Sequence, residues 1–111
     1  MHVHPPAPLA LLSLWEALEG MFSPAKTERK FRVSTNIASY LEPLGTPRME
    51  LRKRVGKPYD ARSQAAHGGS ELPKDALRDS YSLTKRVISK VIEENEVPDR
   101  EKLDEALFGV E

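Results

Sequence analysis

Cysteine is absent from this chain of 111 residues, so neither a disulfide framework nor a thiolate metal site is available to it. Long apolar runs are also missing, because the longest, residues 9–12, is far too short to span a membrane. Residues 1–6 lack the basic start of a secretory signal. We therefore expect a cytoplasmic protein that does not enter the membrane.

The motifs of several enzyme classes are missing as well. The chain has no phosphate-binding loop, no Gly-rich dinucleotide turn and no His-Glu-x-x-His pair. No serine motif resembles a nucleophile elbow. His2 and His4 have no third ligand nearby, so we expect neither a metal site nor a cofactor.

Zero net charge conceals an uneven distribution along the chain. Residues 26–62 contain ten Lys or Arg against four Asp or Glu, whereas residues 93–111 contain two against eight. The basic middle suits an anionic ligand, and the acidic tail suits a basic protein partner. Equally, the two regions could attract each other within one fold or between two copies.

Apolar residues recur at helical spacing, and no strand pattern is present. We expect an all-α fold, in which four main helices form an up-and-down bundle and a short helix follows at the C-terminus. Residues 1–8 are expected to be flexible and residues 9–111 to form one domain. The helices are expected over residues 8–22, 27–41, 46–66, 73–94 and 99–108.

Several residues predict where these helices begin, break and end. Thr46 is the expected N-cap of the third helix. Pro58 removes a helical hydrogen bond and clashes with the preceding turn, so we expect a kink or break near Gly56. Asn95 should end the fourth helix, and Asp99 should cap the fifth. The residues assigned to the core are Leu11, Leu14, Trp15, Leu18, Met21, Phe22, Phe31, Ile37, Ala38, Leu41, Ala76, Leu77, Ser80, Leu83, Thr84, Val87, Ile88, Val91 and Ile92. The apolar residues of the third helix are Met49, Leu51 and Val55, and those of the fifth are Leu103, Ala106, Leu107 and Phe108.

Residues 59–69 carry the strongest chemical signal, a helix that ends at a diglycine with Arg62 inside it and His67 at its exit. Arg grips a phosphate through a planar fork, and His transfers a proton near neutral pH. Their spacing places the two side chains roughly 140° apart on a regular helix, so the helix would have to loosen to turn both toward one groove. The structural alternatives are an Arg62 paired with Asp60 or Glu50, and a His67 that contacts the last carbonyls.

The string Tyr59-Asp60-x-Arg62-Ser63, followed by His67 and a diglycine, resembles the signature of the HEPN superfamily and is closest to its Apea-like branch. Residues 17–24 resemble that branch's first-helix ending, and residues 31–34 resemble the start of its second helix. The resemblance covers roughly residues 11–92. Pro58 departs from the family pattern, and many active HEPN nucleases carry an amide or acid where Ser63 stands here.

The resemblance implies a metal-independent endoribonuclease, in which a dimer groove pairs two Arg-x4-6-His motifs and the RNA 2′-hydroxyl attacks the phosphate. Arg62 would stabilise the charge developing on the phosphate, and His67 would transfer protons to and from the ribose oxygens. Arg54, Lys57 and Ser63 are the residues expected to bind the substrate. A homodimer with His67 near the two-fold axis is expected.

Two other classes of function remain open. One is a non-catalytic HEPN module that binds RNA or a nucleotide, or that scaffolds a toxin–antitoxin or phage-defence assembly. The other is a dimerising helical module whose acidic tail contacts a protein partner. A nuclease requires Arg62 and His67 open in one groove, whereas a binding module requires only a basic groove.

Overall fold

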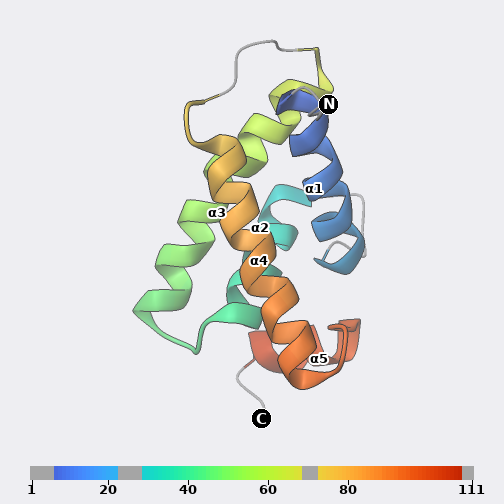
Figure 1. Ribbon diagram of the computed structural model, residues 1–111. Helices are drawn as coiled ribbons and strands as arrows, with labels where there is room; N and C mark the ends of the chain where they lie inside the picture. The colour runs from blue at the N-terminus through green and yellow to red at the C-terminus, as the bar shows by residue number, and fades with distance from the viewer. Residues whose placement is uncertain (1–6, 23–28, 69–72, 109–111) are drawn as a thin grey trace.

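The computed structural model of the chain describes residues 7–22, 29–68 and 73–108, and these form five α-helices (Figure 1). The helices are α1 (Ala7–Phe22), α2 (Arg29–Leu41), α3 (Thr46–Ala66), α4 (Ala76–Glu94) and α5 (Arg100–Leu107). The described ranges contain no strand, so the predicted all-α bundle is confirmed. None of the described helices combines the length and apolarity that crossing a membrane requires.

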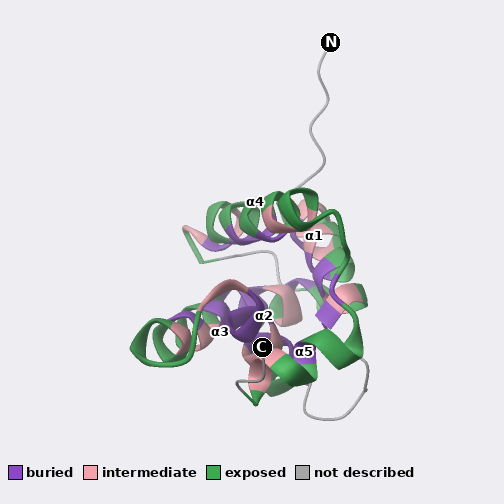
Figure 2. Cartoon of the chain, turned by 90° about the horizontal axis from the view of Figure 1, so that it is seen from below, coloured by how far each residue is buried: buried purple, intermediate pink, exposed green. Residues whose placement is uncertain are grey.

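The helices pack as two layers, with α1 and α4 in one layer and α2, α3 and α5 in the other (Figure 2). Trp15 of α1 is fully buried and contacts helices of both layers. Its indole Nε1 donates a hydrogen bond of 3.0 Å to the Ser80 hydroxyl of α4. Its ring meets that of Tyr59 in α3 edge-on, with the centroids 5.3 Å apart. Trp15 therefore ties three helices together through one side chain, with its polar atom satisfied.

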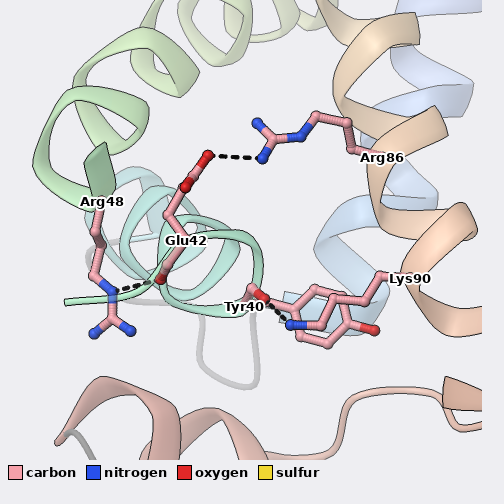
Figure 3. Close-up of polar contacts among 5 residues, drawn as sticks. All are labelled: Tyr40, Glu42, Arg48, Arg86 and Lys90. Atoms are coloured by element: carbon pink, nitrogen blue, oxygen red, sulfur yellow. Dashed lines mark hydrogen bonds and ion pairs between the residues drawn. The ribbon is translucent and has the colours of Figure 1, made fainter. Parts of the chain in front are cut away.

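Cations from other parts of the chain stabilise the C-terminal end of α2 (Figure 3). The last carbonyls of a helix lack partners within the helix and carry partial negative charge. Arg48 Nε donates to the Glu42 carbonyl at 3.0 Å, and another guanidinium nitrogen donates to a carbonyl of α5 at 3.0 Å. From α4, Lys90 donates to the Tyr40 carbonyl, and Arg86 pairs with the Glu42 carboxylate at 2.8 Å. These contacts fix α2 against both α4 and α5.

The third helix differs from its prediction because α3 continues through Pro58 without a break. Of the predicted kink or break near Gly56, the break is therefore wrong, and the kink stays a prediction. Pro58 is itself buried, so packing of the surrounding helix face outweighs the one hydrogen bond that its ring removes. The N-cap is Gly45, whose φ of 126° suits glycine, rather than the predicted Thr46.

The ends of the other helices lie close to the positions predicted from the sequence. α1 ends at Phe22 as predicted, and α4 ends at Asn95, which has a left-handed φ of 55°. Asp99 caps α5 by accepting a hydrogen bond of 2.8 Å from the Lys102 backbone N–H. The expected start of α2 at residue 27 and most of the expected flexible terminus lie outside the described residues.

Three residues assigned to the core are instead exposed at the surface. Phe31 is 59% exposed, Ile88 49% and Ile92 73%. Helical spacing marks an apolar stripe, but it does not indicate how wide an arc the neighbouring helices cover. Those predictions are wrong for this reason, and the exposed apolar residues on α2 and α4 become candidates for binding surfaces.

Candidate functional site

Arg62 lies in the interface between α3 and α1, where another side chain already neutralises its charge. Its Nε is 2.7 Å from Oε1 of Glu19 in α1, and the two side chains are only 24% and 11% exposed. The guanidinium carbon also lies 5.9 Å from the centre of the Tyr59 ring. A partly buried ion pair of this kind orients both side chains and leaves little of the guanidinium for a phosphate.

The sequence predicted the wrong acidic partner for Arg62. Asp60, one of the two expected partners, pairs instead with Lys30 of α2 at 2.9 Å. The actual partner, Glu19, stands on another helix far away in the sequence. Spacing along α3 could not identify it, because the contact depends on how α1 packs against α3.

His67 is exposed at the C-terminal end of α3 and contacts its own helix. Its Nδ1 lies 2.7 Å from the Ser63 carbonyl oxygen. Because a carbonyl oxygen only accepts, Nδ1 carries the proton in this contact, and Nε2 of the neutral ring holds the lone pair. Gly68 follows with a φ of 83°, the usual left-handed end of a helix. The structural alternative for His67, a contact with the last carbonyls, matches this geometry.

The three residues expected to bind the substrate lie at different places along α3. Lys57 lines a groove of about 860 Å³ between α2 and α3. Arg54 lines a smaller groove of about 340 Å³ between α3 and α4. Ser63 is half-buried, and its carbonyl oxygen contacts His67. Lys57 also lines the smaller groove, so it lies beside Arg54, whereas Ser63 lines neither groove.

The larger groove, which we call the α2–α3 groove, brings cations together around an exposed aromatic ring. Lys30 and Phe31 reach it from α2, and Arg52, Lys53 and Lys57 reach it from α3. The ring of Phe31 is 59% exposed. Both basic runs are visible in the sequence, but their meeting in one groove depends on the packing of α2 against α3.

Two polar groups complete the α2–α3 groove. Asp60, the only acidic residue among the described residues that line it, is already paired with Lys30, so the lining keeps a net positive charge. Ser34 is 3% exposed, and its hydroxyl oxygen has no hydrogen-bond partner in the described part of the chain. A buried hydroxyl without a partner is costly.

This combination suits a ligand that carries both phosphates and flat rings. Ammonium and guanidinium groups bind phosphate oxygens through charge-assisted hydrogen bonds. An exposed aromatic ring offers a surface on which a nucleic-acid base stacks. Within the described ranges, no group of three or more His, Asp or Glu is arranged to hold a metal ion.

Comparisons of this chain with protein-family models, curated proteins and solved structures found no match. The resemblance to the HEPN superfamily therefore rests on the sequence strings alone.

Proposed function

We propose that this protein is a HEPN-like helical module that binds single-stranded RNA in the α2–α3 groove. The observation that carries the proposal is the exposed ring of Phe31 surrounded by the cations of Lys30, Arg52, Lys53 and Lys57. Proteins that bind single strands combine a positively charged groove with aromatic side chains on which bases stack.

Each group in the groove has a separate task in this proposal. The cations hold the phosphate backbone and carry no sequence information. Phe31 stacks on a base, which any sequence can supply.

The surroundings of Arg62 support binding rather than cleavage as the main activity. Its guanidinium is neutralised by Glu19 at 2.7 Å, and it is not among the residues that line the α2–α3 groove. To contact a phosphate, Arg62 would have to leave Glu19 as a nearly buried carboxylate, which is costly. A binding module needs no such rearrangement.

The contribution of the groove's cations to RNA affinity is tested by measuring the fluorescence anisotropy of a labelled oligoribonucleotide at a series of salt concentrations. Lys53→Gln/Lys57→Gln should weaken binding about 10-fold and reduce the log–log salt slope by about 0.7 for each lost phosphate contact. The control Lys74→Gln/Arg100→Gln removes the same charge from exposed positions outside the groove. Equal losses of RNA affinity in both variants would mean that the protein attracts RNA through its overall charge and not through the α2–α3 groove.

The contribution of base stacking on Phe31 is tested with a second pair of variants, one in the groove and one outside it. Phe31→Ala should weaken RNA binding by about 10-fold to 100-fold, because a base–aromatic stack contributes on the order of 1–3 kcal/mol. Phe108→Ala removes a ring that is even more exposed, at 78%, and should leave affinity unchanged. An unaltered affinity in Phe31→Ala would remove the aromatic contact from the proposal.

Metal-independent cleavage of RNA is the second candidate, and the geometry of His67 is the observation that favours it. With Nδ1 held by the Ser63 carbonyl, Nε2 is free to accept the proton of a 2′-hydroxyl. The 2′-oxygen would bond to phosphorus, the 5′-oxygen would leave with a proton, and a 2′,3′-cyclic phosphate would result. Arg62 would stabilise the transition state once released from Glu19.

Cleavage in the presence of a chelator separates these two candidates. A nuclease should cut RNA but not DNA, His67→Ala should lower the rate by about 10²–10⁴-fold, and Arg62→Lys should also lose most activity. Cleavage that is negligible with or without His67, together with intact binding, leaves the binding module. Absence of RNA binding even at low salt would favour instead a scaffold for a protein partner, as in toxin–antitoxin or phage-defence assemblies.

A further inference from the structure

The exposed side of α3 carries basic side chains between the two grooves that flank this helix. α3 packs against both α2 and α4, and Lys53, Arg54 and Lys57 are exposed along it. At roughly 100° per residue, Lys57 lies about 40° around the helix from Lys53 and about 60° from Arg54, between the two. Lys53 lines the α2–α3 groove, Arg54 lines the groove between α3 and α4, and Lys57 lines both. The three cations therefore connect one groove to the other across α3.

The groove between α3 and α4, which we call the α3–α4 groove, has a volume of about 340 Å³ and an apolar floor. The floor consists of the buried residues Leu51, Val55, Pro58 and Leu83. None of the described residues that line this groove is aromatic. It therefore offers cations to phosphates and an apolar surface to riboses, but no ring on which a base could stack.

The charges in the α3–α4 groove are unequal, because three cations line it against the single carboxylate of Asp79. Arg86 already pairs with Glu42 at 2.8 Å, and a guanidinium of α4 lies 3.9 Å from Asp79. Arg54 and Lys57, by contrast, form no ion pair with any residue in the described part of the chain. These two side chains can therefore bind phosphate oxygens without leaving a buried carboxylate unpaired.

We infer that a single RNA strand bound in the α2–α3 groove continues over Lys57 into the α3–α4 groove, so that the ligand is an oligonucleotide and not a mononucleotide. The inference rests on the proposed function, because it extends the path of the same strand. With its side chains, a helix is about 10–12 Å across, so one nucleotide stacked on Phe31 does not reach Arg54. The site should span at least about four nucleotides, the lower end of the range for modules that bind single strands.

The two grooves contribute to RNA affinity in different ways. The α2–α3 groove stacks a base on Phe31 and binds phosphates, whereas the α3–α4 groove binds only phosphates and riboses. The contribution of the α3–α4 groove should therefore depend on strand length and on salt, and not on which bases the strand carries.

Fluorescence anisotropy with oligouridylates of two lengths tests this path. A strand of about three nucleotides is shorter than the site and should bind the wild type and Arg54→Gln equally. With a strand of about twelve nucleotides, Arg54→Gln should weaken binding about 3-fold to 10-fold and reduce the log–log salt slope by about 0.7. The control Arg100→Gln removes the same charge from an exposed position outside both grooves and should leave both affinities unchanged. Comparing variant and wild type at one length cancels the additional registers that a longer strand offers.

Arg54→Lys separates charge from helix surface, because an ammonium still binds a phosphate as a point charge and should keep the salt slope. Equal affinities of Arg54→Gln and the wild type for the long strand, with Phe31-dependent binding of the short one, overturn the path and leave the proposed function standing. A loss in Arg54→Gln that is as large for the short strand also overturns it. A wild type that binds neither length, even at low salt, overturns the path and the proposed function together.

Discussion

At the scale of single residues, the fold depends on a few polar groups inside the helix layers. Ser80 is fully buried, accepts the Trp15 indole N–H at 3.0 Å and donates to the Ala76 carbonyl at 2.7 Å. Ser80→Ala should lower the free energy of unfolding by about 1–3 kcal/mol, because the indole N–H loses its partner. Urea denaturation measures the change, and Ser82→Ala, at an exposed position of α4, should leave stability nearly unaltered.

Glu19 provides a second test at this scale, because it neutralises Arg62 inside the α1–α3 interface. Glu19→Ala should destabilise the protein by about 1–3 kcal/mol, since a partly buried cation then lacks its counter-ion. Glu16→Ala removes an exposed carboxylate of the same helix and serves as the matched control. Equal stabilities of the two variants, measured by urea denaturation, would mean that the ion pair does not hold Arg62 in place.

Tyr40 gives the stability of the fold a predictable dependence on pH. Burial and the nearby carboxylates of Glu94 and Glu96 raise the pKa of its phenol above 10.0, although Lys102 acts in the opposite direction. The folded state therefore holds the proton more tightly than the unfolded state. The stability that results is complete below pH 10.0 and is lost as the pH rises through the folded pKa.

Tyr40→Phe should abolish this loss of stability at high pH. It should cost little below that range, because the Tyr40 hydroxyl has no hydrogen-bond partner among the described residues. Thermal unfolding at a series of alkaline pH values compares it with Tyr81→Phe, which leaves Tyr40 in place. A Tyr40→Phe protein that loses as much stability as Tyr81→Phe above pH 10.0 would assign the effect to another group.

At the scale of helices, α3 combines poor helix formers with the surface proposed to bind RNA. A Cβ added at Gly56 would lie 3.4 Å from Cε of Lys30, the flexible end of a side chain that lines the α2–α3 groove. Gly56→Ala should therefore stabilise the protein by about 0.5–1 kcal/mol and weaken RNA binding slightly. Gly20→Ala, where nothing lies within 4 Å, should stabilise without any effect on binding. Thermal unfolding and RNA titration of both variants distinguish these outcomes.

Some features of the helices could be predicted from the sequence, and others could not. Helix ends at Asn95 and Asp99 were predictable, because caps depend on a few adjacent residues. Continuity through Pro58 was not, because it depends on packing of the buried face of α3. Phe31 has the spacing of a core residue, and only the arrangement of α2 against α3 exposes it.

The candidate site was predictable only in part. The basic runs that include Lys30 and Lys53 indicated a surface for an anion, and they line one groove. The string around Arg62 suggested catalysis, but Glu19 neutralises that guanidinium from a distant part of the sequence. Contacts between residues far apart in a chain depend on the fold, so local motifs do not indicate them.

At the scale of the whole molecule, charge is distributed to serve several purposes. The basic middle contacts the acidic tail within the fold at one point, where Arg48 donates to the Ala106 carbonyl of α5 at 3.0 Å. The lining of the α2–α3 groove keeps a net positive charge after Lys30 pairs with Asp60.

The location of RNA on the protein is tested most directly by a nuclear magnetic resonance titration of the isotope-labelled protein with an unstructured oligoribonucleotide. Binding in the α2–α3 groove should shift the backbone signals of residues 30–34 and 52–57, in proportion to the bound fraction, and leave α5 unaltered. The largest shifts around Arg62 and His67, or no shifts at low salt, where phosphate contacts are strongest, would contradict binding in this groove.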